Sequence, residues 1–196
     1  MIHEVHGLRD DIRATADRFS GEGFEALAVD LFTGRNRAVC MARFFAGLLA
    51  RPFDNLAIRD LKVALTWLGD RPEVDSERLG AIGFCMGGGF AIAWACTDAR
   101  LRVIAPFYGM NPRPLGAVRR GCPIVGSYPG KDFTARHGRK LDAELAAAGV
   151  PHDVKIYPGA KHSFANTPRT DAEREAAEDA FARTLAFFRE HLRPAA

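Results

Sequence analysis

The chain has 196 residues, 47% of them hydrophobic and 26% charged, and its formal net charge is +3. This length and composition predict one globular domain, residues 1–196, with a sizeable buried core. Basic residues are scattered between acids, charges interrupt the hydrophobic runs, and no charged, apolar leader opens the chain, so we expect no nucleic-acid tract, no membrane span and no signal peptide.

Several segments have the apolar spacing of amphipathic helices. Asp10 or Asp11 can cap a first helix, and Asp54 can cap a longer one. The longer helix is predicted to bury one face made of Ile58, Leu61, Leu65 and Leu68. Further helices are predicted near residues 90–96, 134–148 and 170–191.

Short apolar runs between these helices predict strands. They lie at residues 24–30, 79–84, 101–107, 122–127 and 153–157. Because strands and helices alternate along the chain, the sequence predicts an α/β fold with a mostly parallel sheet.

The most informative segment is Gly83-Phe84-Cys85-Met86-Gly87-Gly88-Gly89, which joins a predicted strand to a predicted helix. A strand, a sharp turn and a helix form the G-x-S-x-G nucleophile elbow, here with cysteine in the serine position. A Cβ at position 83 or 87 is expected to clash where strand and helix nearly touch. Free N–H groups and the helix dipole are expected to favour the Cys85 thiolate. The alternative is a buried structural cysteine beside a flexible glycine turn.

Two further candidates follow later strands in the order acid, then base. Asp132 lies in the turn after the strand at 122–127, and His162 lies in the loop after the strand at 153–157. Parallel strands end at one edge of a sheet, so both side chains are expected on the rim that carries Cys85. The alternatives are a helix-capping aspartate and a loop histidine bonded to backbone. Agreement in order and place favours a Cys-His-Asp triad.

Together these segments resemble the dienelactone hydrolases, a cysteine branch of the α/β-hydrolase superfamily. The likeness begins at His3-Glu4-Val5-His6-Gly7, which is similar to the family's His-Glu-x-x-Gly turn. It continues through residues 26–32 and the elbow, and closes with Tyr157-Pro158-Gly159-Ala160-Lys161-His162-Ser163-Phe164. The resemblance covers nearly the whole chain. It implies a three-layer α/β-hydrolase fold and hydrolysis of an activated ester or lactone, like that of a carboxymethylenebutenolidase.

The resemblance also implies roles for individual residues. Cys85 is implied to be the nucleophile, His162 the base and Asp132 the residue that orients it. Glu4 is implied to lie near the thiol and to control its protonation, with a surface carboxylate near the chain terminus as an equal alternative. The backbone N–H groups implied to form the oxyanion hole are those of Met86 and Val5.

The substrate is expected to differ from the family's usual one. In the family, an arginine that helps hold the substrate carboxylate typically stands a short step after the catalytic histidine, and here that position is Asn166. A neutral amide cannot form the ion pair that arginine offers a carboxylate, which puts dienelactone itself in doubt. Ser163 is a candidate to hydrogen-bond a substrate oxygen. The competing functions are a thioesterase or acyltransferase at the same site, and a non-catalytic thiol sensor.

The cysteines, at positions 40, 85, 96 and 122, lack metal-ligand spacing, so neither a metal nor another cofactor is expected. A free nucleophilic thiol suits a reducing cytoplasm, and we expect a monomer or small homo-oligomer that acts on a small molecule.

The chain start raises a separate expectation. In α/β-hydrolases two strands normally precede the one that ends in the His-Glu turn, and here only a stub precedes Glu4. The sequence therefore predicts that the N-terminal strands of the fold are truncated. The strand at 24–30 is then expected to become a sheet edge. We expect either an upstream start in the natural protein or a partner chain that covers the gap, with Val5 loosely held otherwise.

Overall fold

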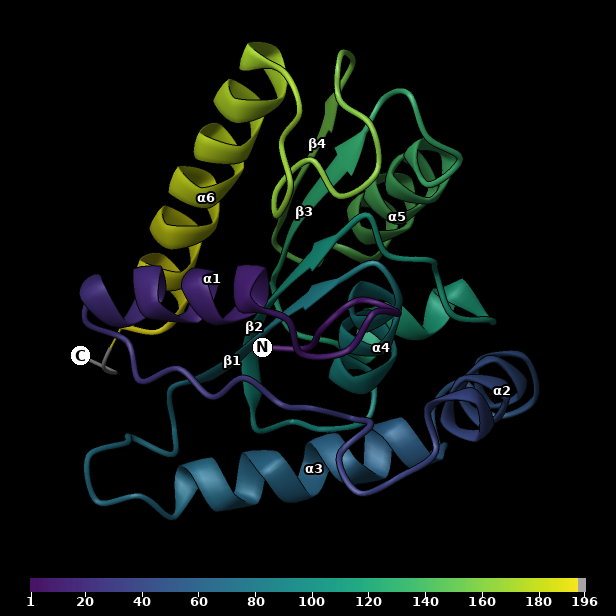
Figure 1. The fold of residues 1–196 in the computed structure, drawn as a ribbon, viewed down its shortest axis with the longest axis vertical. Coiled ribbons are helices and arrows are strands. Elements are labelled where there is room, and N and C mark those ends of the chain that lie inside the picture. Colours follow the sequence, from purple (N-terminus) through teal and green to yellow (C-terminus); the bar gives the residue numbers. More distant parts are fainter. Residues whose placement is uncertain (194–196) are drawn as a thin grey trace.

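The computed structural model describes residues 1–193, which are built around one parallel sheet in the order β1-β2-β3-β4 (Figure 1). The strands are Leu79–Phe84 (β1), Leu101–Phe107 (β2), Ile124–Pro129 (β3) and His152–Tyr157 (β4). The predicted α/β class with a parallel sheet is confirmed. The strands end nearly level, since Phe84 pairs with Phe107 and Pro129 pairs with Tyr157. Their carboxyl ends therefore form one rim.

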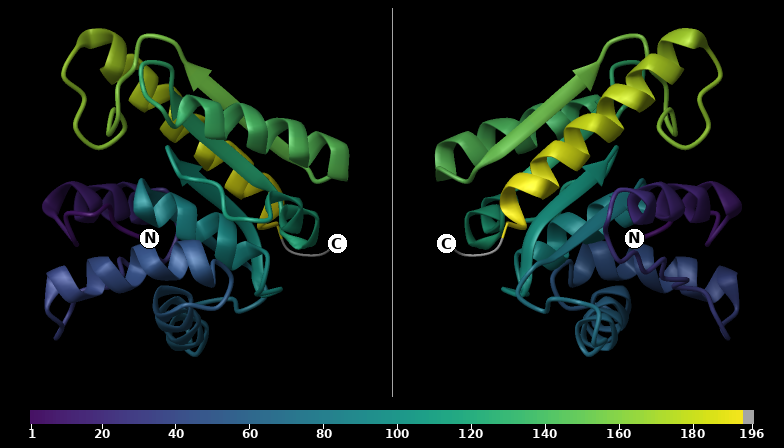
Figure 2. Two further views of the ribbon diagram at one scale, coloured as in Figure 1. Left: turned by 90° about the vertical axis from the view of Figure 1, so that its right-hand side faces the viewer. Right: turned by 90° about the vertical axis from the view of Figure 1, so that its left-hand side faces the viewer.

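Helices cover both faces of the sheet. They are α1 (Asp10–Gly21), α2 (Arg37–Ala50), α3 (Leu56–Gly69), α4 (Met86–Ala95), α5 (Ala135–Ala148) and α6 (Asp171–His191), with a 3₁₀ turn at Leu115–Arg120. Figures 1 and 2 show α6 along one face of the sheet and α5 along the other. One apolar cluster joins α1 and α6 to the sheet, and a second joins α2, α3, α4 and α5 to its other face. The result is the expected three-layer arrangement.

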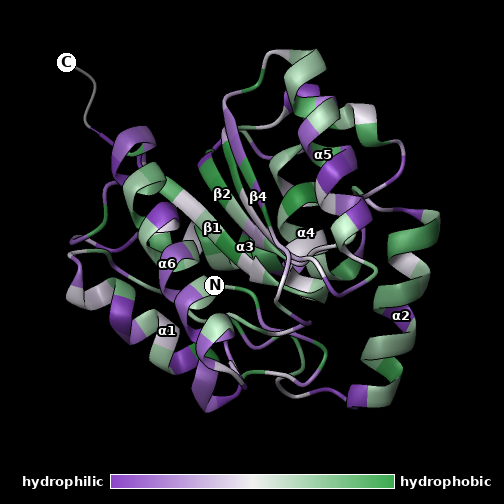
Figure 3. Cartoon of the chain, turned by 90° about the horizontal axis from the view of Figure 1, so that it is seen from above, coloured by the Kyte–Doolittle hydropathy of each residue, from purple (hydrophilic) through white to green (hydrophobic). Residues whose placement is uncertain are grey.

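The sheet is apolar because it is covered on both sides. Val103, Ile104 and Ala105 in β2 have no exposed surface, and Figure 3 shows this strand in hydrophobic colours. The edge strand β4 instead alternates, and its Asp153 and Lys155 are exposed.

Two element starts differ from the sequence prediction. Helix α3 is capped by Asn55, whose side-chain oxygen accepts from the N–H of Ile58 at 3.2 Å, and Asp54 instead pairs with Arg59. Strand β3 starts at Ile124, two residues later than predicted, because Pro123 has no N–H to donate to a neighbouring strand.

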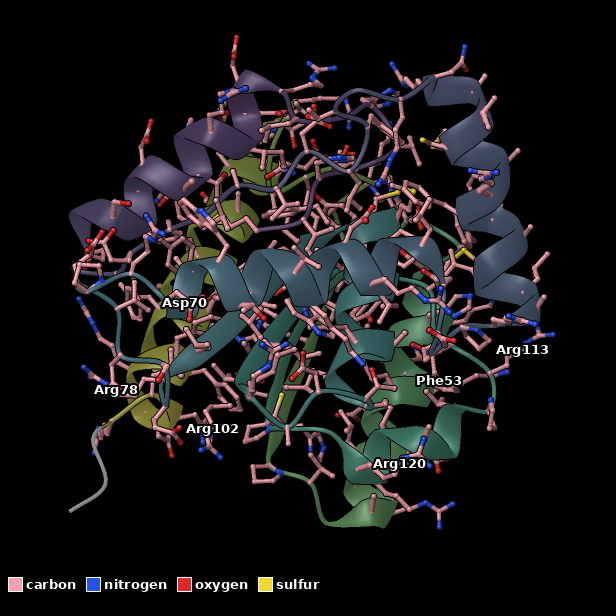
Figure 4. The ribbon with its side chains drawn as sticks, turned by 90° about the horizontal axis from the view of Figure 1, so that it is seen from below. Phe53, Asp70, Arg78, Arg102, Arg113 and Arg120 are labelled. Atoms are coloured by element: carbon pink, nitrogen blue, oxygen red, sulfur yellow. The ribbon has the colours of Figure 1, made fainter. Side chains whose placement is uncertain are left out.

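The strand predicted at residues 24–30 is wrong. Only Val29 forms a bridge there, to Ile2, and Ile2 also bridges Gly83 of β1. Toward the amino end of β1, residues 24–26 form no bridge to that strand within residues 1–193. A cavity of about 470 Å³ occupies the space between them and is lined by Phe24, Leu79 and other residues. Within residues 1–193, Leu27 accepts from the terminal amine of Met1, and residues 24–26 have no strand with which to pair. Figure 4 views the molecule from below and labels Arg78, which also lines this cavity.

The segment before Glu4 is firmly bonded on both sides. Ile2 is buried, its N–H donates to the carbonyl of Ile82 at 2.8 Å, and its own carbonyl accepts from Phe84 at 3.1 Å. On the other side Val29 donates to the carbonyl of Met1 at 3.0 Å. The expectation of a loosely held segment is therefore wrong, because these backbone bonds anchor it between β1 and residues 27–29.

Candidate active site

Cys85 lies in a strained turn between β1 and α4. Its φ of 54° falls in the left-handed region, and it is the residue that precedes the first turn of α4. A Cβ at Gly83 would stand 2.1 Å from the carbonyl oxygen of Gly87, which confirms the predicted close approach of strand and helix. At Gly87 the obstacle is different, because a Cβ there would stand 2.5 Å from the carbonyl oxygen of Ile2. The elbow thus packs against the N-terminal segment.

The thiol of Cys85 has a raised pKa of about 11. Burial raises this pKa most, and the charge of Glu4 raises it further. The backbone N–H groups of Met86 and Val5 favour the thiolate and lower the pKa, while the charge of Asp132 raises it. The predicted preference for thiolate is wrong, because burial and the neighbouring carboxylates outweigh the two N–H donors.

Asp132 and His162 form a pair at the same rim. The Nδ1 atom of His162 lies 2.9 Å from Oδ2 of Asp132, and Oδ1 of Asp132 accepts from the N–H of Thr134 at 2.7 Å. The two loops lie side by side because the N–H of Lys131 donates to the carbonyl of Ala160 at 3.0 Å. Asp132 therefore orients the imidazole and also stabilises the start of the next helix.

The structure brings the pair and the thiol to one rim without a direct hydrogen bond. Within residues 1–193, the His162 side chain hydrogen-bonds Asp132. It does not hydrogen-bond the Cys85 sulfur. The ring of Tyr108 fills part of the space beside the imidazole, with 4.8 Å between ring centroids. Asp132 is near enough to Cys85 to raise the thiol pKa.

Glu4 lies in a polar cluster rather than free at the surface. Its carboxylate accepts from the hydroxyl of Ser163 at 3.0 Å and from the amide of Asn166 at 3.4 Å. The same amide donates to the hydroxyl of Tyr108 at 3.2 Å. Burial and the charge of Glu4 raise the pKa of Tyr108 well above its ordinary value, so its hydroxyl stays protonated. Ser163 and Asn166, predicted to face the substrate, thus contact Glu4, and their contact with a substrate stays a prediction.

His3 fixes the backbone beside Glu4. It is fully buried, its Nε2 accepts from the N–H of Leu31 at 3.0 Å, and its Nδ1 lies 2.6 Å from the carbonyl oxygen of Glu4. Because Nε2 accepts, the proton is on Nδ1 and is donated to that carbonyl. Arg37 of α2 donates to the carbonyl of Val5 at 3.0 Å. The turn that carries the proposed carboxylate and N–H donor is therefore held from two sides.

Sequence reasoning missed Tyr108 and the bonding role of His3. Tyr108 directly follows β2. Functional residues of parallel sheets lie just beyond the carboxyl ends of strands, and applying this rule to β2 as well could have identified Tyr108. Within residues 1–193, the non-glycine residues with positive φ are Cys85, Tyr108 and Ser163. All three lie at this rim. Backbone strain of this kind concentrates at functional sites, where surrounding contacts hold it in place.

The part of the chain that the structure describes contains no group of three or more His, Cys, Asp and Glu side chains able to hold a metal ion. None of its helices is long and apolar enough to cross a membrane.

Comparisons with known proteins agree with the resemblance. The model of the dienelactone hydrolase family matches residues 1–192. A protein of Saccharolobus solfataricus that carries the name carboxymethylenebutenolidase is 30% identical, over 96% of this chain and 87% of its own length. A protein of the same name from Escherichia coli K12 is 26% identical, over 97% of this chain and 76% of its own length.

Solved structures give the same result. A Klebsiella pneumoniae protein described as a dienelactone hydrolase matches 95% of this chain and 84% of its own, with a TM-score of 0.77 and 25% identity. A dienelactone hydrolase-like promiscuous phosphotriesterase from metagenomic libraries matches 98% of this chain and 85% of its own, with a TM-score of 0.81 and 25% identity. The expected α/β-hydrolase fold is confirmed.

Proposed function

Because the chain belongs to the dienelactone hydrolase family, we propose that it hydrolyses a neutral activated ester or lactone through Cys85, His162 and Asp132. The observation that carries the proposal is the placement of these side chains at one rim, with Cys85 on a strained elbow and His162 bonded to Asp132 at 2.9 Å. A half-buried base oriented by a carboxylate, at the same rim as a nucleophile on a sharp turn, supports nucleophilic catalysis.

The proposed reaction has two steps. In the first, His162 takes the proton from the Cys85 thiol, and the sulfur attacks the ester carbonyl to form an acyl-cysteine while the alcohol leaves with a proton from the imidazolium. In the second, His162 takes a proton from water as the water oxygen attacks the acyl-cysteine. The carbon–sulfur bond then breaks, the acid is released, and the Cys85 sulfur regains a proton from the imidazolium. Asp132 keeps the imidazole in the tautomer that accepts at Nε2 and stabilises its charged form.

The two N–H groups beside the sulfur supply the proposed oxyanion hole. The N–H groups of Met86 and Val5 lower the pKa of the Cys85 thiol, which supports their role as donors to the oxygen of the attacked carbonyl. Loss of one such donor typically costs about 10²–10³ in rate. His3 and Arg37 maintain the position of Val5 through the backbone bonds described above.

Glu4 is proposed to keep the resting thiol protonated. Its charge adds to burial in raising the pKa of Cys85 to about 11. A thiol is much less prone to oxidation than a thiolate, so the resting nucleophile is protected until a substrate is bound. Such protection suits the cytoplasmic location that we propose for the protein.

The charges around the site favour neutral substrates. The charges of Glu4 and Asp132 both raise the pKa of Cys85, and the side chains that hydrogen-bond Glu4 are the neutral Ser163 and Asn166. An incoming carboxylate would meet like charge with no cation supplied from position 166. The proposed substrates are therefore uncharged esters and lactones.

The experiment that tests the function is a screen of the purified protein with p-nitrophenyl acetate, simple lactones and dienelactone. We expect hydrolysis of the neutral substrates and little activity on the anionic dienelactone. Acyl thioesters are included, since faster cleavage of these would favour a thioesterase. A protein that reacts with peroxide and releases product from none of the substrates would instead be a thiol sensor, and the proposal would be wrong.

A further inference from the structure

A buried carboxylate on α6 closes the loop that carries His162. Glu173 is 2% exposed, and its Oε1 accepts from the N–H of Lys161 at 3.0 Å. Its Oε2 accepts from the N–H of Arg169 at 2.8 Å. The two donors stand on either side of His162 in the chain, so one side chain holds both ends of the loop 161–169.

Other contacts reinforce this closure. The guanidinium of Arg169 donates to the carbonyl of His162 at 3.1 Å, and the hydroxyl of Thr170 accepts from the N–H of Glu173 at 3.1 Å. Thr170 is thus the N-cap of α6 and Glu173 its third residue, the spacing of a capping box. In that motif the glutamate bonds back to the N–H of the cap residue. Here both oxygens are instead used on the neighbouring loop.

The helix start also favours the charged form of Glu173. A carboxylate in the first turn of a helix lies at the positive end of the helix dipole. Although burial raises the pKa of Glu173, the N–H groups of Arg169 and Lys161 outweigh it and lower the pKa. The carboxylate is therefore ionised at neutral pH and makes two charge-assisted hydrogen bonds to the loop.

We propose that Glu173 is a positioning residue that sets the place of the His162 imidazole. The inference rests on the proposed function, in which His162 is the base. Asp132 holds the imidazole from the side-chain end, and Glu173 holds the backbone from which it projects. Both restraints are needed to define the ring, because a side chain pivots about its Cα. A displacement of about 1 Å in a reacting group can cost about 10²-fold in rate.

The test uses two substitutions in the full chain. Glu173→Gln keeps the shape and loses one acceptor, because its amide nitrogen would face an N–H donor. Glu173→Asp keeps the charge at the helix start and is too short to reach both donors. Each is expected to lower kcat for p-nitrophenyl acetate by about 10-fold to 100-fold with KM unchanged. The matched control is Glu175→Gln, an exposed position on the same helix, which should leave kcat unchanged.

A second readout does not depend on turnover. The Nδ1 proton that His162 shares with Asp132 should give a strongly downfield NMR signal in the wild-type protein. Both Glu173 variants should shift or broaden this signal, and Glu175→Gln should not. Folded variants with wild-type kcat and an unchanged signal would overturn the proposal, as would a loss of kcat that only parallels loss of folded protein. If the wild type cleaves no ester, the proposed function fails, and the proton signal still tests the role of Glu173.

Discussion

The Cys85 thiol is kept in its protonated form by the groups around it. With a pKa of about 11, only about one thiol in a thousand is ionised at pH 8. A resting enzyme of this kind cannot rely on a preformed thiolate. In the proposed mechanism His162 removes this proton as the substrate binds, which would make the position of that imidazole decisive for the rate.

Replacing Glu4 with glutamine should make Cys85 more reactive toward alkylation. The substitution removes a negative charge that raises the thiol pKa, so the pKa falls and the thiolate population grows tenfold for each unit. Iodoacetamide reacts with the thiolate, and labelling at pH 8 followed by peptide mapping measures the change. Cys96 and Cys122 are internal references, because burial raises their pKa values to about 11 and about 12.

The matched control for this experiment is Asp17→Asn, which removes one negative charge from an exposed position on α1. Its labelling rate at Cys85 should equal that of the wild type. Equal labelling of Cys85 in the Glu4→Gln protein and the wild type would mean that burial alone sets the thiol pKa.

Substitutions in the triad should abolish most of the turnover. Cys85→Ala or His162→Ala should each lower kcat by several orders of magnitude, because the members act as a unit. Asp132→Asn should cost about 10⁴, as the wrong histidine tautomer does in serine enzymes. Rates on p-nitrophenyl acetate and circular dichroism spectra separate chemistry from folding. An active Cys85→Ala protein would refute the mechanism.

At the scale of the elements, the sequence predicted best the helices and strands that begin or end at a glycine or proline with a clear conformational role. The glycines around Cys85 predicted the elbow, and Pro123 could have fixed the start of β3 more closely. The strand expected at residues 24–30 failed for another reason. Strand formation needs a partner, and whether a neighbour is present along residues 24–26 is a property of the assembled sheet.

At the site, too, contacts that depend on the assembled fold could not be predicted from the sequence. The common position of Cys85, Asp132 and His162 at one rim could be predicted, because each residue follows a strand of the parallel sheet. Their catalytic roles stay a prediction. The contacts of Ser163 and Asn166 with Glu4 could not be predicted, since they join residues about 160 positions apart. Only the folded chain brings the two segments together, and there the side chains of Ser163 and Asn166 donate hydrogen bonds to Glu4.

The elbow helix and the N-terminal segment should be coupled through Gly87. In a Gly87→Ala protein the new Cβ would stand 2.5 Å from the carbonyl oxygen of Ile2 and 2.7 Å from that of His3. The backbone that positions Glu4 must then move. We expect a loss of about 1–3 kcal/mol in the free energy of unfolding and a lower kcat. Urea unfolding and ester hydrolysis measure the two effects.

Gly159→Ala is the matched control, because nothing lies within 4 Å of a Cβ at that position and it is in the loop that precedes His162. It should keep wild-type stability and activity. Wild-type behaviour of the Gly87→Ala protein would mean that the N-terminal segment can shift without affecting the site.

At the scale of the whole molecule, the N-terminal segment connects the two apolar cores. Ile2 belongs to the core that contains α2, α3, α4 and α5, whereas Met1 packs against the core of α1 and α6. His3 follows directly and is fully buried. The protonation state of His3 should therefore affect how firmly the N-terminal segment is held between the sheet and the two cores.

Acidification should destabilise the fold before most carboxylates are protonated. Burial lowers the pKa of His3, and the neighbouring Asp30 raises it only in part. The unfolded chain binds a proton at this residue near its ordinary pKa of about 6.5, whereas the folded protein binds it only at lower pH. The stability that His3 contributes is thus fully present above about pH 6.5 and is lost as the pH falls through the folded pKa. It amounts to about 1.4 kcal/mol for each unit of the shift.

Urea unfolding of the full chain at pH 7.5 and pH 5.5 measures this loss, and NMR titration of the imidazoles assigns it. We expect a lower free energy of unfolding at pH 5.5 and a His3 ring that stays neutral in the folded protein at that pH. Burial lowers the pKa of His137 as well, so that ring adds to the loss of stability in the same direction.

Protonation of His3 would force its Nε2 to donate toward the N–H of Leu31, which is already a donor. The bond that anchors the turn before Glu4 would then break, so ester hydrolysis should decline only at the lower pH at which the folded protein binds this proton, after stability has begun to fall. Constant stability between the two pH values would show that the ring is protonated within the fold.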